Sequence, residues 1–317
     1  MLSYARRTVV RAWSLFIALA KVMVPVFVLV RLAEVAGVID TLGALAGPTM
    51  LPVGLPPELG VAWVACLLVG PPAAIAAMTI LEGPLTVAQV SIFATMMLIA
   101  HALPVESAIV ARAQNADGRG RPFWRAFWVN VALRLGGAYA FGIPAYVILS
   151  MTGWMAEPVD LSHLTGGEAQ GWAEWLVSAA TLLLTILAII LALLVLLDAM
   201  EWVGITATLK RAMRPVLGAA GVGERTIPLV TIGTLLGITY GAGLIIREVE
   251  SGAIPPSERG PALAWLSLSH SVIEDTGLML VIGASMWVTL GARLAFTLAA
   301  VRLLSVALSG RRRAAST

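Results

Sequence analysis

His101-Ala102-Leu103-Pro104-Val105-Glu106 interrupts one long apolar run of this chain, and His270-Ser271-Val272-Ile273-Glu274-Asp275 interrupts another. Each stretch begins with a histidine and has a carboxylate five residues later. Pro104 disfavours helix at the preceding residue and lacks a backbone donor. Ionisable residues inside apolar segments are costly to bury in a membrane and are usually functional. The two stretches therefore predict two broken helices that carry equivalent polar groups.

The two stretches belong to a longer internal repeat. Residues 34–54 and 201–221 align at a constant offset of 167, and WVNVALRL at 128–135 aligns with WVTLGARL at 287–294. Secondary transporters are commonly built from two copies of one unit, with the site where the copies meet. We predict a first repeat over 1–151, an acidic extracytoplasmic linker over 152–172 and a second repeat over 173–317.

The composition indicates a membrane protein. Of the 317 residues, 59% are hydrophobic and 12% are charged, whereas soluble domains carry about 25% charged residues. Several apolar runs reach the ~20 residues that cross a bilayer as a helix, which satisfies its own backbone. We therefore predict an all-α polytopic fold with the lipid bilayer as its surroundings. The apolar segments are 12–33, 60–81, 85–110, 124–150, 173–199, 227–246, 261–283 and 285–309.

The basic residues predict the orientation of these segments. Fourteen of the 21 Lys and Arg fall in four segments, 1–11, 111–125, 204–225 and 311–313. Cytoplasmic loops concentrate Lys and Arg, so all four segments belong on one side of the membrane. That arrangement requires three crossing helices per repeat, with the remaining segment as a re-entrant hairpin. The repeats are then inverted, and both termini are cytoplasmic in a multi-pass protein of the bacterial inner membrane.

The hairpins are expected at 85–110 and 261–283, because those segments hold the two interruptions. Their tips would meet near the bilayer midplane, where non-helical backbone needs surrounding protein or a water-filled cavity. This arrangement predicts a site that contains His101, Glu106, His270, Glu274 and Asp275. The alternative for the histidines is that they only cap the broken helices.

Arg134 and Arg293 lie about ten residues into the last segment of each repeat, hence ~15 Å deep. A charge at the bilayer centre costs at least ~2.5–3.5 kcal/mol without a partner, and we expect Glu106 and Asp275 as partners. The arginines then either hold the fold together or bind an anionic substrate group. Asn130 and Thr289, four residues before each arginine, share its helical face.

Gly70, followed by two prolines, occupies the position of Gly237 in the second repeat. Broken helices at equivalent positions point to a transporter site, whereas a simple packing kink is the alternative. The single cysteine, Cys66, excludes an internal disulfide and a cysteine metal site.

The HALPVE stretch and its counterpart at 270–275 resemble the nucleoside-recognition or Gate domain family. That family includes proteins related to the spore maturation membrane proteins, and its domain recurs in ferrous iron transport protein B and in concentrative nucleoside transporters. The resemblance covers most of the chain as two Gate-like units and implies a translocation unit with re-entrant hairpins. It leaves the substrate open, because no nucleoside-binding residue is matched and the cysteine-containing Gate motif is absent.

These patterns favour a secondary transporter or permease for a small polar solute, nucleoside-like in character, or a cation. If a metal binds, its ligands would be His101, Glu106, His270 and Asp275, although the arginines would compete with it. The alternative is a non-transporting Gate-type subunit that scaffolds a larger complex, as a homo-oligomer or with a partner membrane subunit. No P-loop, Rossmann, HExxH or GxSxG motif is present, so we expect no enzyme activity, no cofactor and no nucleic-acid partner.

Overall fold

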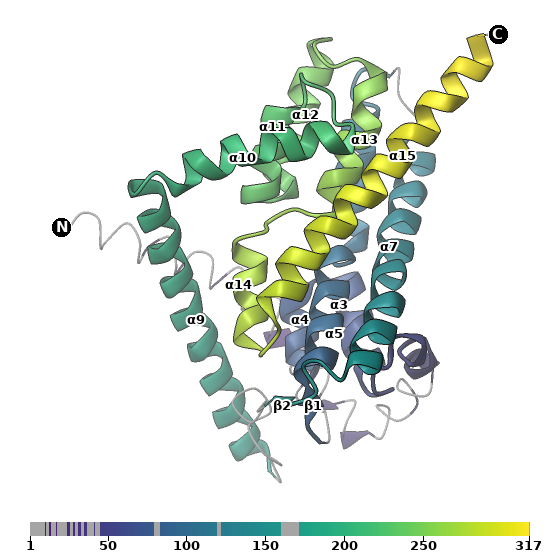
Figure 1. Ribbon diagram of the computed structural model, residues 1–317. Helices are drawn as coiled ribbons and strands as arrows, with labels where there is room; N and C mark the ends of the chain where they lie inside the picture. The colour runs from purple at the N-terminus through teal and green to yellow at the C-terminus, as the bar shows by residue number, and fades with distance from the viewer. Residues whose placement is uncertain are drawn as a thin grey trace. The chain divides into compact units, whose positions relative to one another are not determined.

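The computed structural model describes residues 45–78, 83–118, 122–159 and 171–316, with scattered positions between 10 and 41. The described residues are nearly all α-helical (Figure 1). Most of the predicted apolar segment 12–33 and 160–170 of the acidic linker lie outside the described residues. The elements are η1 Gly47–Thr49, η2 Leu51–Val53, α3 Leu59–Leu68, α4 Pro71–Ala77, β1 Leu85–Thr86, α5 Val87–Ile99, α6 Leu103–Gln114, α7 Phe123–Thr152, β2 Pro158–Val159, α9 Trp172–Trp202, α10 Ile205–Ala220, α11 Ile227–Leu236, α12 Ile238–Glu250, α13 Pro256–Leu268, α14 Glu274–Val281, η4 Trp287–Ala292 and α15 Arg293–Ser316.

The chain forms two compact units, and each combines segments from both halves of the sequence. Unit 1 comprises 1–97, 143–205 and 277–285, and unit 2 comprises 98–142, 206–276 and 286–317. In unit 1, α3 packs on α4, and the Trp63 ring lies 6.3 Å from the Phe93 ring. Strands β1 and β2 pair antiparallel in the same unit, with Leu85 opposite Val159.

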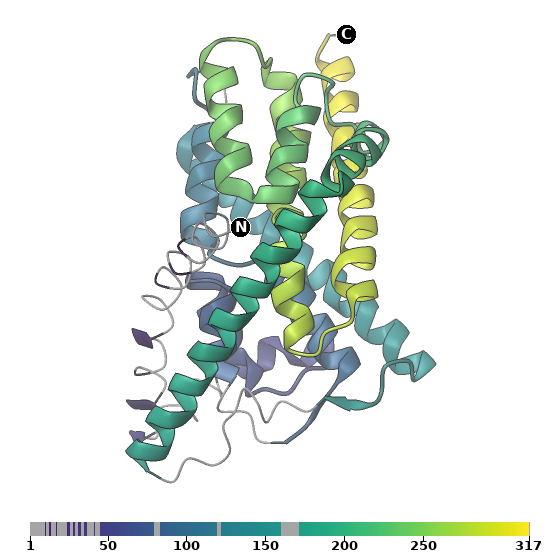
Figure 2. The ribbon, with the colours of Figure 1, turned by 90° about the vertical axis from the view of Figure 1, so that its left-hand side faces the viewer.

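Unit 2 contains the buried polar core of the molecule. Helix α13 packs against α6, α11, α12 and α15, and Figure 2 shows α12 and α13 side by side. Trp265 of α13 is fully buried, and its indole N–H donates to the Thr234 hydroxyl of α11 at 3.0 Å. Three arginines, Arg134, Arg259 and Arg293, are also buried in this unit.

Two helices among the described residues are long and apolar enough to cross a membrane. They cover Phe123–Thr152 and Trp287–Leu308. A third candidate is the pair α5 and α6, whose axes differ by 42° at the break between Ile99 and Leu103. Pro104 lies in the first turn of α6. Backbone N–H groups in a first turn have no acceptor within the helix, so proline, which lacks this group, costs no hydrogen bond there. The break predicted at HALPVE is therefore confirmed, whereas the inverted arrangement of the repeats stays a prediction.

Positive φ angles recur at matched positions of the two halves. Gly54 and Gly221 have φ values of 68° and 85°, and Gly70 and Gly237 have φ values of 139° and 109°. Ala102 and Ser271, each directly after a histidine, have φ values of 43° and 47°. Left-handed backbone is unfavourable for residues with a Cβ and is concentrated at functional sites. Positions that the predicted repeat aligns therefore share this backbone conformation, whereas the two-repeat organisation stays a prediction.

The sequence left a broken helix or a packing kink open at Gly70 and at Gly237, and the structure shows a break at both. Gly70 separates α3 from α4, and Gly237 separates α11 from α12. The φ values at both glycines are ones that side chains other than hydrogen rarely allow. Gly237 is also crowded, because an added Cβ would lie 2.9 Å from the Ser271 hydroxyl. The paired glycines therefore break the helices rather than kink them.

We predict that Gly70→Ala or Gly237→Ala lowers the free energy of unfolding by about 1–3 kcal/mol, because alanine is strained at these φ values. The matched control is Gly136→Ala in α7, where an added Cβ meets nothing within 4 Å and helix propensity favours alanine by about 0.5–1 kcal/mol. Thermal unfolding of the purified proteins in detergent measures the difference. Equal melting temperatures for all three variants would contradict the role of the two glycines.

Candidate polar centre of unit 2

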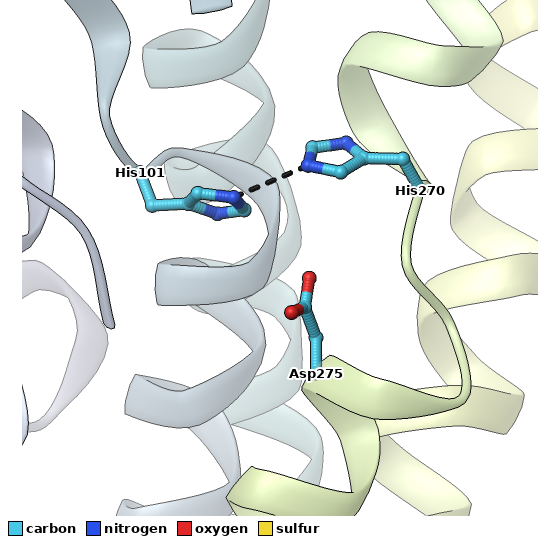
Figure 3. Close-up of side chains that lie close together, drawn as sticks. All are labelled: His101, His270 and Asp275. Carbon is cyan, nitrogen blue, oxygen red and sulfur yellow. Dashed lines mark hydrogen bonds between the residues drawn. The ribbon is translucent and has the colours of Figure 1, made fainter. Parts of the chain in front are cut away.

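The two histidines predicted from the repeat lie against each other (Figure 3). The Nε2 atoms of His101 and His270 are 3.2 Å apart, and the exposed fractions of the two residues are 6% and 2%. His101 follows the end of α5, and His270 follows the end of α13. The left-handed residue after each histidine turns the chain at once, so each imidazole leaves its helix at the break.

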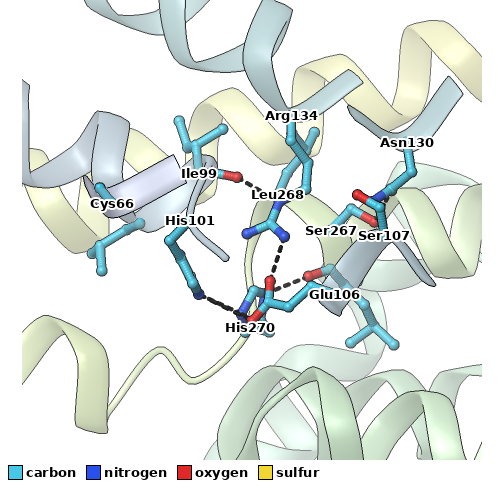
Figure 4. A network of polar contacts seen from close by, with 12 residues as sticks. Cys66, Ile99, His101, Glu106, Ser107, Asn130, Arg134, Ser267, Leu268 and His270 are labelled. Atoms are coloured by element: carbon cyan, nitrogen blue, oxygen red, sulfur yellow. Dashed lines mark hydrogen bonds and ion pairs between the residues drawn. The ribbon is translucent and has the colours of Figure 1, made fainter. Parts of the chain in front are cut away.

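Glu106 joins both histidines. Its Oε1 atom lies 3.2 Å from His101 Nε2 and 3.3 Å from His270 Nε2. Its Oε2 atom accepts a hydrogen bond from Arg134 Nη1, which completes the predicted ion pair (Figure 4). Glu106 is in the first turn of α6, where a carboxylate is also favoured by the helix dipole.

The hydrogen bonding of His270 defines the tautomer of its neutral ring. Its Nδ1 lies 2.7 Å from the Leu266 carbonyl oxygen, which can only accept, so Nδ1 carries the proton. The Nε2 atom of a neutral His270 then has a lone pair. That lone pair points toward His101 Nε2 and the Glu106 carboxylate. An Nδ1–H bond to a backbone carbonyl is the arrangement by which proteins orient a metal-binding or proton-binding imidazole.

The buried arginines hold the carbonyl groups at the ends of the broken helices. Arg134 Nε donates to the Ile99 carbonyl at 2.9 Å, and Arg293 Nε donates to the Leu268 carbonyl at 3.1 Å. Ile99 and Leu268 are the last residues of α5 and α13, so the two arginines make equivalent contacts. The last carbonyls of a helix have no intrahelical donor, and here a guanidinium satisfies them.

Arg293 differs from Arg134 in its remaining contacts. Its Nη2 donates to the carbonyls of Leu98 at 2.8 Å and His270 at 3.4 Å. Within the described ranges no ion pair joins Arg293 to Asp275, which the sequence had suggested as its partner. The helix ends and the loop offer carbonyl acceptors to Arg293, and these accept from its Nε and Nη2 groups.

Asp275 points its carboxylate toward the two histidines (Figure 3). One ligand atom from each of these three residues lies within 4.8 Å of the other two. The buried Asp275 Oδ2 atom has no hydrogen-bond partner among the described residues. Glu274 instead begins α14 with an exposed side chain, so the structure does not bring it into the cluster.

Asn130 and Thr289, the remaining predicted site residues, are buried at 3% and 0% exposure. Asn130 Nδ2 donates to the Ser107 hydroxyl at 3.0 Å, and its Oδ1 accepts from Ser267 Oγ at 2.6 Å (Figure 4). Asn130 also lines a cavity of about 110 Å³ between α6, α7, α13 and α15. Thr289 lies in the π-helical segment η4, directly before α15; such segments are rare and are frequent at functional sites.

Several contacts of the centre could not be found from side-chain chemistry. The carbonyls of Leu98, Ile99 and Leu266 are bonded by a guanidinium or an imidazole, but every residue has a carbonyl. Ser107 and Ser267 were also missed. The only available signal was the position of Ser107 directly after Glu106 and of Ser267 three residues before His270.

The three atoms His101 Nε2, His270 Nε2 and Glu106 Oε1 form a nearly equilateral triangle with sides of 3.2, 3.2 and 3.3 Å. Two ligands of a tetrahedral Zn²⁺ with bonds of about 2.0–2.1 Å are separated by roughly 3.3 Å. Imidazole nitrogen and carboxylate oxygen are ligands for divalent transition metals. The triangle therefore has the dimensions of one face of a metal site, and it also has the basic groups to hold a proton.

A comparison with known proteins supports the membrane location. The chain is 28% identical over 275 residues to the "Uncharacterized membrane protein YvoD" of Bacillus subtilis (strain 168), a match that covers 85% of this chain and 83% of the relative. No family model and no solved structure matches the chain. Together with the apolar helices, the relative identifies a membrane protein, and membership of the nucleoside-recognition family stays a prediction.

We predict that Glu106→Gln lowers the free energy of unfolding by about 3–5 kcal/mol, because it leaves the buried Arg134 without its carboxylate. The control is Glu224→Gln, which removes an exposed pair with Arg214 whose side chains are 74% and 71% exposed. Such surface pairs contribute about 0–1 kcal/mol. Chemical denaturation of both variants measures the difference, and similar losses would show that Glu106 is not part of a buried pair.

Proposed function

We propose that this membrane protein is a secondary transporter or permease whose buried centre binds a cation. The cation site comprises His101, His270, Glu106 and Asp275. Transport of a nucleoside-like solute has less support, because a nucleobase usually stacks on an aromatic ring. Among the described residues, the ring contact recorded for each of these histidines is with the other histidine.

One observation carries the proposal. The triangle of His101 Nε2, His270 Nε2 and Glu106 Oε1 contains at most one N–H when both rings are neutral, because the proton of His270 is on Nδ1. Two electron-rich atoms, His270 Nε2 and Glu106 Oε1, then face each other at 3.3 Å. A proton or a metal ion between them converts this repulsion into binding.

Asp275 supports the same function, because its carboxylate also points toward the histidines. Its buried Oδ2 atom has no hydrogen-bond partner among the described residues, and a buried carboxylate oxygen without a partner is costly in a low-dielectric interior. A cation that reaches the histidines would compensate this charge. Ionisable groups of this kind inside membrane segments mark ion pathways and proton relays.

A non-transporting membrane subunit is the second candidate. The arginine contacts favour it, since Arg134 bonds one helix-end carbonyl and Arg293 bonds two. Buried charges with such contacts stabilise a fold without moving any solute. In that case the polar centre would bind no cation, and its residues would affect assembly and stability alone.

The test is a flux assay on purified protein in liposomes that contain a pH-sensitive dye or, separately, a dye for divalent metal ions. With an imposed proton, Mn²⁺ or Zn²⁺ gradient, the wild-type protein should carry one of these cations faster than empty liposomes. Asp275→Asn should abolish this flux and weaken cation binding by at least about tenfold. Replacing a group that only hydrogen-bonds a metal ligand already has an effect of that size. The melting temperature of the variant should not fall, because the Asp275 Oδ2 atom has no hydrogen-bond partner to lose in the part of the chain that the structure describes.

Glu224→Gln is the control for this assay, because it removes an exposed carboxylate and should leave the flux unchanged. Flux of none of the three cations by the wild-type protein would contradict transport. Normal flux by both Asp275→Asn and His101→Gln would exclude the polar centre as the cation site.

A further inference from the structure

Unit 2 also contains buried donors that neither the fold nor the cation site uses. Arg134 Nη2 and Arg293 Nη1 have no hydrogen-bond partner among the described residues, and both arginines have 0% exposure. The Ser269 hydroxyl is likewise buried and without a partner in this part of the chain. Buried polar groups are nearly always bonded, and an unbonded charged group is especially costly.

The two guanidinium groups are neighbours. Arg293 Nη2 donates to the carbonyl of Leu98, and Arg134 Nε donates to the carbonyl of the next residue, Ile99. Two positive charges therefore lie at the same helix end, in a region with little solvent to screen them. Glu106 pairs with Arg134, but no carboxylate among the described residues pairs with Arg293.

Ser269 lies within the loop that Arg293 holds. The carbonyls of Leu268 and His270, on either side of Ser269, both accept from Arg293, at 3.1 and 3.4 Å. The Ser269 residue, whose hydroxyl lacks a partner among the described residues, is thus flanked by two carbonyls that bond the Arg293 guanidinium. Figure 4 shows the second terminal nitrogen of Arg134 pointing away from Glu106, without a dashed contact.

The charges of the centre indicate which ligand would satisfy these donors. The two guanidinium groups and the carboxylates of Glu106 and Asp275 sum to zero when the histidines are neutral. A bound proton would leave one positive charge in the membrane interior, and a divalent metal ion would leave two. A co-bound monovalent anion restores neutrality when a proton is bound and leaves one positive charge beside a divalent metal ion, and it accepts hydrogen bonds from the donors that lack an acceptor.

We propose that Arg134 Nη2, Arg293 Nη1 and Ser269 Oγ form a binding site for a small anion, either a halide or a monocarboxylate. The charge-balance argument rests on the proposed cation transport. The argument from the unpartnered donors is independent of that proposal. The anion would bind beside the cation centre, and the two ions would cross together or the anion would hold the loaded state. Water molecules would satisfy the donors without balancing the charge.

The binding test uses thermal unfolding of the purified full chain with sodium chloride, formate or acetate, against sodium gluconate at the same ionic strength. We expect at least one of the three anions to raise the melting temperature saturably, by about 2 °C or more at 100-fold its dissociation constant. Ser269→Ala should shift the half-saturation concentration upward several-fold, and Arg293→Lys should abolish the effect. Arg211→Lys changes an exposed guanidinium and should leave the titration unchanged.

A linear, non-saturating response, or a response that is identical in wild type and Ser269→Ala, would overturn the anion site and indicate ordered water. If Arg293→Lys does not fold, isothermal titration of chloride, formate and acetate into wild type and Ser269→Ala decides the question alone. Anion binding without flux of a proton, Mn²⁺ or Zn²⁺ would contradict the proposed transport but support the anion site. Cation flux with no anion binding by either method would overturn the anion site alone.

Discussion

The contacts between two buried arginines and the carbonyls of broken helices are the interactions on which the centre depends. A helix that ends inside a membrane protein leaves carbonyl groups without donors, and water is not there to satisfy them. Arg134 and Arg293 supply those donors at equivalent ends of α5 and α13. Because the helices end there, two histidines can leave their helices at the same level and meet.

The same contacts bring positive charge into a region that must be nearly neutral. Glu106 compensates Arg134 and also contacts both histidines, so one carboxylate links fold stability to the proposed ion binding. Asp275 and Arg293 are not paired in this way, although they occupy the equivalent positions. The second half of the centre therefore retains, among the described residues, buried groups of both signs without a hydrogen-bond partner, and the proposed ligand binding rests on these groups.

The backbone also limits what can vary in this protein. Each break contains a residue with a positive φ angle that holds it in one conformation; these residues are Ala102, Ser271, Gly70 and Gly237. The position of Ser271 beside Gly237 joins the break between α11 and α12 to the loop that carries His270. The polar centre is thus connected through the backbone to a second break in the same unit, and disturbing Gly237 would reach the histidines.

The sequence alone determined the membrane class, the break at HALPVE and the Glu106–Arg134 pair, because hydropathy, a proline inside an apolar run and buried charge leave local signals, and the internal repeat stays a prediction. It did not determine that 60–81 and 227–246 are broken, since a glycine inside an apolar run permits a kink or a break equally. Tertiary structure decided three further features: the carbonyl partners of the arginines, the tautomer of His270, and the position of Glu274 outside the cluster that contains Asp275. Each depends on which backbone groups and side chains packing brings within hydrogen-bond distance, and residue type carries no record of that.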